Sequence, residues 1–134
     1  MLKAMMISAL AIGAAGCVAD AERSAELTPE GEAELAAALA GKVAQEPRSC
    51  VSLRDLRGNK SIADRYILFE GRGDEVYLSR ASGGCDISPW EAIEVRTTGT
   101  QLCEGEAVRV FDPRTGMFAG SCILGEFTPY RDEG

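Results

Sequence analysis

Four of the five cysteines, Cys50, Cys85, Cys103 and Cys122, are the feature that most constrains how this chain folds. An even number of cysteines in a segment this short predicts a framework of disulfides if the segment lies in an oxidising compartment. A domain this small buries a limited core, so such bonds supply stability that burial alone does not. Four cysteines allow three connectivities, and spacing does not choose among them. The preferred pairing is Cys50–Cys85 with Cys103–Cys122, because neighbouring cysteines commonly link adjacent strands of small β domains.

A metal site is the rival interpretation of the cysteines. The chain has no Cys-x-x-Cys pair and no histidine, so neither a metal nor another cofactor is expected. The lack of histidine also excludes Ser-His and Cys-His nucleophile pairs. Asp55, Asp64 and Asp86 are considered as a calcium or acid–base site, but nothing in their spacing supports one. An enzyme is therefore less expected than a non-enzymatic protein.

The first residues predict an export signal. Lys3 supplies a positive charge, and the run from Ala4 to Ala15 is apolar or small apart from Ser8. This run is shorter than the roughly 20 apolar residues that a membrane-spanning helix needs, but it fits the hydrophobic region of a secretory signal. An N-terminal core helix is the weaker interpretation, because apolar residues cover every face of the run.

The segment Ala14-Ala15-Gly16-Cys17 predicts processing of the bacterial lipoprotein type, with Cys17 as the lipidation site. The usual leucine three residues before the cysteine is Ala14 here, which leaves open an ordinary cleavage after Ala19 or Ala21. The expected location is the periplasm or cell envelope, with a lipid on Cys17 as the membrane anchor. The predicted divisions are a signal peptide at 1–16, an Ala/Glu-rich tether at 17–47, a disulfide-stapled β domain at 48–130 and a polar tail at 131–134.

The net charge bears on the partners. The whole chain has a formal charge of −7, and removal of residues 1–16, which carry Lys3 and no acid, changes it to −8. An acidic surface repels phosphate backbones and anionic headgroups, so the domain itself is not expected to bind nucleic acid or the membrane surface. Attachment to the membrane is expected through the lipid on Cys17. The same charge favours a basic partner or serves only solubility.

A short helix is predicted within the tether. Thr28 is a suitable N-cap and Gly41 a suitable end. Leu35 and Leu39 are spaced at i and i+4, which gives a narrow apolar stripe. The sequence therefore predicts a helix over Glu30–Ala40 that docks lightly on the domain, with disorder as the competing interpretation.

From Cys50 onward, apolar and polar residues alternate and turn residues recur at short intervals. The clearest signal is a hairpin around Gly71-Arg72-Gly73-Asp74, since its glycines allow a tight turn. This turn also explains the integrin-type tripeptide Arg-Gly-Asp, and Asn59-Lys60-Ser61 is interpreted as a surface turn. The fold class is mainly β, a small antiparallel barrel or sandwich with two disulfides, preceded by the signal peptide and the short helix. The expected strands are Cys50–Leu53, Tyr66–Glu70, Glu75–Leu78, Ala92–Arg96, Ala107–Phe111 and Met117–Leu124.

Several segments of the β domain resemble a known family. They are Cys50-x-x-Leu53-Arg54-Asp55, Ile67-Leu68-Phe69-Glu70-Gly71, Gly84-Cys85, Gln101-Leu102-Cys103-x-Gly105 and Ser121-Cys122-x-Leu124-Gly125-x-Phe127. Together they resemble domain-of-unknown-function family number 6491, small exported four-cysteine proteins of proteobacteria that are often lipoproteins. The resemblance covers roughly Cys50 to Thr128. It implies the β fold and export, and it implies no catalytic residue.

The expected function is that of a non-enzymatic binding or structural module, tethered at the membrane of the cell envelope. The expected partner is a periplasmic protein or a basic secreted protein. Trp90 is a candidate ligand contact, although a core position is the favoured interpretation of this lone tryptophan beside a proline. The alternative function is thiol–disulfide exchange by Cys103 and Cys122, although these cysteines lack the Cys-x-x-Cys spacing.

Overall fold

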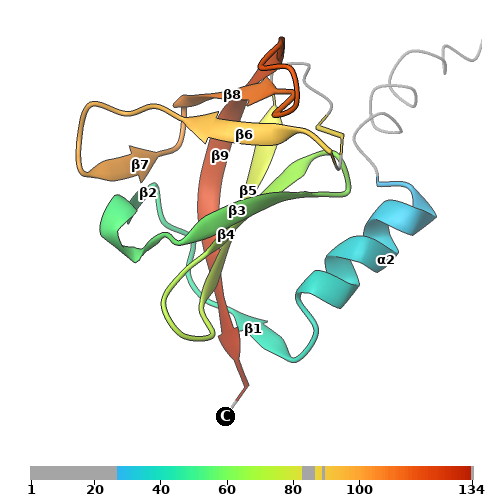
Figure 1. Cartoon of the computed structure of the whole chain (residues 1–134). Coiled ribbons are helices and arrows are strands. Elements are labelled where there is room, and N and C mark those ends of the chain that lie inside the picture. The colour runs from blue at the N-terminus through green and yellow to red at the C-terminus, as the bar shows by residue number, and fades with distance from the viewer. Residues whose placement is uncertain (1–26, 83–86, 89, 134) are drawn as a thin grey trace, which may run out of the picture.

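The computed structural model describes residues 27–82, 87–88 and 90–133, and this part of the chain is mainly β (Figure 1). A helix and a short 3-10 turn accompany the strands. In chain order the elements are α2 (Pro29–Ala38), β1 (Lys42–Ala44), β2 (Cys50–Ser52), η1 (Leu53–Asp55), β3 (Gly58–Ile62), β4 (Tyr66–Glu70), β5 (Val76–Ser82), β6 (Ala92–Val95), β7 (Gln101–Cys103), β8 (Ala107–Phe111) and β9 (Phe118–Asp132).

Most of the strands form one antiparallel sheet that curves almost into a barrel. Its order is β3-β4-β5-β9-β8-β6, and β1 pairs with the far end of β9. β3 and β6 lie at opposite ends of this order, yet they contact each other. β2 and β7 form a separate pair at one side of the molecule (Figure 1). The predicted mainly β fold is therefore confirmed, in the form of a nearly closed barrel.

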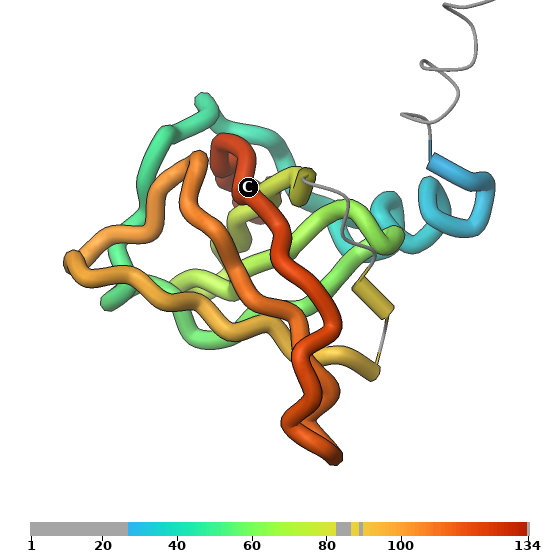
Figure 2. Tube along the Cα trace, turned by 90° about the horizontal axis from the view of Figure 1, so that it is seen from above, coloured from blue at the N-terminus to red at the C-terminus, as the bar shows by residue number. Residues whose placement is uncertain are grey.

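The longest strand, β9, joins the parts of this barrel. It pairs with β8 through its first residues, with β5 through its middle and with β1 from Tyr130 to Asp132. Between the β8 and β1 segments, Arg48 bridges to Phe127 through backbone hydrogen bonds of 2.7 and 2.8 Å. Figure 2 shows this strand, in red, crossing the molecule. Through Phe127, the second half of β9 therefore holds the backbone of Arg48 against the sheet.

Two hydrophobic cores lie on the two faces of the sheet. The interior of the barrel holds the larger one, in which the rings of Phe69 and Phe127 meet edge to face with centroids 5.8 Å apart. A smaller cluster, made of Ile62, Leu68 and Leu78, lies on the outer face of β3, β4 and β5. Successive residues of a strand point to opposite faces, so Leu68 and Phe69 serve different cores. This is why β4 is apolar on both faces.

α2 covers the outer cluster. The Thr28 side chain accepts a hydrogen bond from the Gly31 N–H at 3.1 Å, as an N-cap does. Leu35 and Leu39 then pack against the outer cluster. The predicted docked helix is confirmed over slightly shorter bounds. From α2 onward, the segment expected to be a tether is packed on the barrel, and β1 makes it part of the sheet.

The predicted strands are found, but others were missed. β4 and β8 match their predicted ranges, while β9 continues past Leu124 to Asp132, so residues 131 and 132 belong to the sheet and not to a tail. The interpretation of Asn59-Lys60-Ser61 as a turn is wrong, because these residues lie in β3. β3 is at one end of the sheet order, where polar side chains are tolerated. β1 and β7 have no counterpart among the predicted strands.

The preferred disulfide connectivity is also wrong, because Cys50 bonds Cys103. The two cysteines are directly opposite each other in the β2–β7 pair. Backbone hydrogen bonds join residues 49 with 104 and 53 with 100, which places the cysteines in a non-hydrogen-bonded position where side chains approach most closely. The rule of neighbouring cysteines fails because β2 pairs with a strand 53 residues further along the chain.

Some of the predicted features lie outside the described residues. They are the signal peptide, Cys17, Cys85 and Asp86. Within the described residues, no helix has the length and apolar character needed to cross a membrane.

Candidate functional site

The turn η1 separates two concave surfaces. It follows β2 directly, so the Cys50–Cys103 disulfide anchors the strand from which η1 starts. Leu53 and the adjacent Leu56 line one surface, and Asp55 lines the other. The position of η1 therefore shapes both surfaces.

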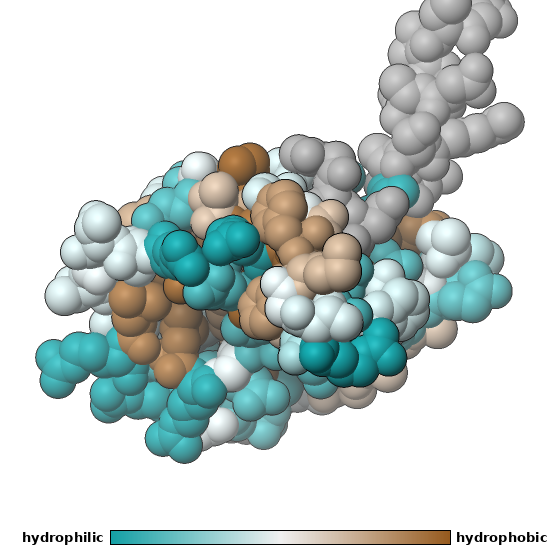
Figure 3. Space-filling view, turned by 45° about the horizontal axis from the view of Figure 1, so that its top comes forward, coloured by the Kyte–Doolittle hydropathy of each residue, from teal (hydrophilic) through white to brown (hydrophobic). Residues whose placement is uncertain are grey.

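The first surface, which we call the apolar hollow, lies where β3 and β6 approach each other. It has a volume of about 230 Å³. Figure 3 shows apolar side chains gathered in a hollow on this side of the molecule, with hydrophilic residues around it. Phe69 of the interior core, which is 1% exposed, is among its lining residues, so the hollow borders this core. The lining residues are Leu53, Leu56, Arg57, Gly58, Asn59, Phe69 and Val95.

The second surface, which we call the arginine cleft, gathers cationic side chains on a chain whose net charge is −7. The cleft has a volume of about 270 Å³, and a groove of about 390 Å³ adjoins it and shares Arg48 and Arg131. Three arginines and two carboxylates in the cleft leave one excess positive charge. The lining residues are Arg48, Asp55, Arg72, Glu75, Tyr77 and Arg131.

Two of the three arginines are paired with carboxylates inside the cleft. The Nε atom of Arg72 lies 2.9 Å from a carboxylate oxygen of Asp55. The Nε atom of Arg131 lies 2.6 Å from a carboxylate oxygen of Glu75, whose side chain is only 14% exposed. The second pair is the better shielded from solvent, so its attraction is less screened.

Arg48 differs from the other two. Its backbone is fixed by the bridge to Phe127. Among the described residues, its guanidinium makes no hydrogen bond and no ion pair. Arg48 therefore carries the excess positive charge of the cleft.

Tyr77 and Glu75 connect the cleft with the interior core. Burial, together with the hydrogen bond to Glu75 and the charge of that carboxylate, raises the pKa of Tyr77 from 10.0 to about 12. Burial alone would raise the pKa of Glu75, but hydrogen bonds from Tyr77 and Arg131 outweigh it and lower that pKa. At neutral pH the pair is therefore a neutral phenol that donates to an ionised carboxylate.

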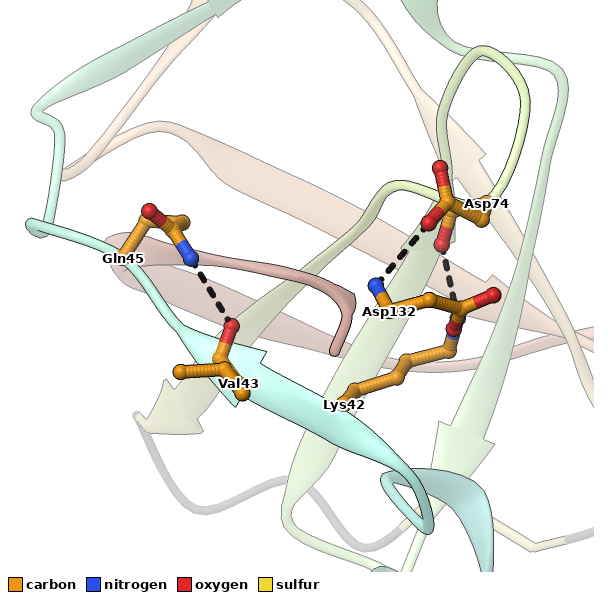
Figure 4. A network of polar contacts seen from close by, with 5 residues as sticks. All are labelled: Lys42, Val43, Gln45, Asp74 and Asp132. Atoms are coloured by element: carbon orange, nitrogen blue, oxygen red, sulfur yellow. Dashed lines mark hydrogen bonds and ion pairs between the residues drawn. The ribbon is translucent and has the colours of Figure 1, made fainter. Parts of the chain in front are cut away.

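A polar network at the far end of β9 holds the elements of the cleft together (Figure 4). The Lys42 ammonium donates to the Asp74 carbonyl at 2.7 Å and lies 2.8 Å from the Asp132 carboxylate. The Asp132 N–H donates to the Asp74 carboxylate at 2.9 Å, and this hydrogen bond lowers the pKa of Asp74. The turn that bears Arg72 is thus tied to the strand end that bears Arg131.

Of the site residues proposed from the sequence, the described part of the chain brings together Cys50 and Cys103, in the disulfide. Trp90 is 61% exposed, so its interpretation as a core residue is wrong. Cys103 bonds Cys50 and not Cys122, so the redox pair of the alternative function is not formed. Cys122 is buried in the interior core. Of the acids considered for an ion site, Asp55 is paired with Arg72.

A metal site finds no support in the described part of the chain. No group of three or more Cys, Asp or Glu side chains there is arranged to hold an ion.

The arginine cleft is not predicted by any pattern in the sequence. Its residues come from segments that are far apart in the chain, and the sequence patterns place Asp55, Arg72 and Glu75 in other contexts. A possible signal is that Arg48 and Arg131 flank the apolar strands in a strongly acidic chain, but only the pairing of β9 with its neighbours brings them together.

Comparison with known proteins adds no relative. No protein-family model, curated protein or solved structure matches this chain. The evidence for the chemistry of the arginine cleft is therefore the geometry of its own side chains. Guanidinium groups form planar, paired hydrogen bonds with carboxylates and phosphates, so the cleft is suited to binding an anionic group.

Proposed function

We propose that the chain is an exported envelope protein, tethered by a lipid on Cys17, whose barrel binds a partner and catalyses no reaction. The observation that carries the proposal is the disulfide between Cys50 and Cys103. Disulfides form and persist in oxidising compartments, which supports export. The same bond anchors the strand before η1, so it supports a preorganised surface of the kind that binding favours.

The sequence supports the finer points of the proposal. The apolar run before Cys17 has the length of a secretory signal. Because Cys50 and Cys103 are bonded to each other, we expect Cys85 and Cys122 to form the second disulfide. Membership of domain-of-unknown-function family number 6491 belongs to the same proposal. The net charge of −7 favours a basic periplasmic or secreted protein as the partner.

Export and lipidation are tested by expressing the full chain, with its own N-terminus, in a bacterial host. We expect it in the membrane fraction, with an N-terminal peptide that begins at an acylated Cys17 in mass spectrometry. The matched control is Cys17→Ser, which should be found in the soluble fraction. An unprocessed cytosolic chain with all cysteines open to alkylation would contradict the proposal.

Binding is tested by site-specific photo-crosslinking in the same cells. A photoreactive residue in place of Leu56 probes the apolar hollow, and one in place of Arg114, whose side chain is 76% exposed in a distant turn, serves as the control. We expect a defined crosslinked product from position 56 alone. Equal products from both positions, or none from position 56, would speak against a binding module.

A further inference from the structure

Within the described residues, Arg48 is the one cation of the arginine cleft that no carboxylate holds in an ion pair, although its charge acts on Glu75 and Tyr77. Asp55 pairs with Arg72 and Glu75 pairs with Arg131. Arg48 has no hydrogen bond or ion pair at its guanidinium in this part of the chain, although it lines the same cleft. A guanidinium offers five donors in a fixed plane, so it is well suited to receive two oxygens of one ligand.

Arg48 combines a fixed backbone with an exposed side chain. Its backbone is fixed to β9 by two hydrogen bonds to Phe127. On β9, four residues further along, Arg131 is held by Glu75. Because these contacts fix the backbone of Arg48 and the side chain of Arg131, binding at this place requires little further ordering of the backbone.

The balance of charge favours a carboxylate over a phosphate. Three arginines and two carboxylates leave a charge of +1, and the raised pKa of Tyr77 keeps its phenol neutral at neutral pH. A monoanion neutralises this charge. A phosphate dianion would leave excess negative charge beside Asp55 and Glu75, which like-charge repulsion opposes.

We propose that the arginine cleft binds a carboxylate group, with the guanidinium of Arg48 as its principal donor. The ligand is either a small free carboxylate or the carboxylate at the end of a peptide, whose remainder would lie in the adjoining groove beside Gln45 and Pro47. The inference rests on the proposed binding function and names the chemical class of its ligand. It does not depend on export or on lipidation.

The test is a titration of the purified full chain, with disulfides intact, followed by the nuclear magnetic resonance signals of the arginine Nε–H groups. The probes are acetate, a short peptide with a free C-terminus, the same peptide with an amidated C-terminus, and inorganic phosphate. We expect saturable shifts of the Arg48 signal with the first two probes. Tighter binding of the peptide than of acetate would identify a chain terminus as the source, and equal binding would identify a small carboxylate.

Variants of the cleft and of the adjoining groove test the role of each charge in binding. Arg48→Gln should weaken binding about tenfold, the effect of losing a charge-assisted hydrogen bond. Glu46→Gln, which removes an exposed acid that lines the adjoining groove, should strengthen it about two- to fivefold. Arg114→Gln is the matched control, because it removes an exposed arginine elsewhere, and it should leave binding unchanged.

Four results would overturn the inference. They are the absence of saturable shifts, equal binding of the amidated peptide, tighter binding of phosphate, and undiminished binding by Arg48→Gln. Failure of this titration in a chain that is acylated at Cys17 would refute the carboxylate site and leave the export proposal intact.

Discussion

Tyr77 is the residue through which the interior core and the arginine cleft are coupled. Its ring is buried in the core, and its hydroxyl donates a hydrogen bond to Glu75, which in turn holds Arg131. A change at this one side chain therefore affects both the packing of the barrel and the charges of the cleft.

We predict that Tyr77 makes the stability of the protein fall at alkaline pH. The ordinary pKa of a tyrosine is 10.0 and that of Tyr77 in the folded chain is about 12, so the folded state holds this proton more tightly. The contribution is complete below pH 10.0 and is lost as the pH rises towards about 12. A shift of this size corresponds to about 2–3 kcal/mol. The measurement is urea unfolding across this range, and Tyr77→Phe should show a smaller alkaline loss.

Gly71 is a position where the backbone leaves no room for a side chain. A Cβ atom there would lie 2.8 Å from the Glu75 carbonyl oxygen and 2.9 Å from Cε2 of Tyr77. We predict that Gly71→Ala lowers the free energy of unfolding by about 1–3 kcal/mol, as overpacking does. Gly120→Ala is the control, because a Cβ there meets nothing within 4 Å. Equal effects of the two variants in thermal unfolding would contradict this account.

At the scale of the elements, the disulfide determines how firmly η1 is held. Cys50 and Cys103 close a loop with a sequence separation of 53. We predict that the double variant Cys50→Ser/Cys103→Ser loses about 4 kcal/mol of unfolding free energy, because the open loop has more entropy when unfolded. Urea unfolding measures the loss. Unchanged stability would show that the β2–β7 pair does not need the bond.

We predict that α2 can unfold locally while the barrel stays folded. Thr28→Ala removes the oxygen that accepts the Gly31 N–H, which should cost about 1 kcal/mol of helix stability. In hydrogen exchange, the amides of α2 should therefore exchange faster while those of β5 keep their protection. Faster exchange throughout the sheet would show that the helix and the barrel unfold as one unit.

Elements with a clear local pattern could be predicted from the sequence. β8 alternates apolar and polar residues, and glycines mark the turn at the end of β4. The bounds of β8 and β4 are therefore predicted accurately. β3 was missed because Gly58-Asn59-Lys60-Ser61 has the composition of a turn, and its strand conformation depends on pairing with β4. The Cys50–Cys103 bond was missed because it depends on which distant strands pair, which spacing does not reveal.

The site was predictable to a smaller extent than the fold. The arginine cleft exists only when η1, the β4–β5 turn and the end of β9 are assembled, so no short motif carries it. The net charge of −7 also gives no indication of a cationic surface. The exposure of Trp90 was likewise not readable from its neighbours, because it depends on how the chain before β6 meets the barrel.

For the molecule as a whole, we predict stability that hardly changes with pH between about 6 and 8. The chain contains no histidine, the side chain whose ordinary pKa lies in this range. The lowered pKa of Glu75 gives a contribution that is complete above its ordinary pKa of 4.5 and is lost only as the pH falls below it. Urea unfolding at several pH values measures this. A slope near neutrality would reveal another titrating group.

β9 has a consequence for the order of assembly. It pairs with β8, β5 and β1, all of which precede it in the chain. A polypeptide that emerges N-terminus first, whether from the ribosome or through a membrane pore, cannot close this architecture until its last strand arrives. Until then, β5 and β8 each lack the neighbour that joins them into one sheet, so the two halves of the barrel stay separate.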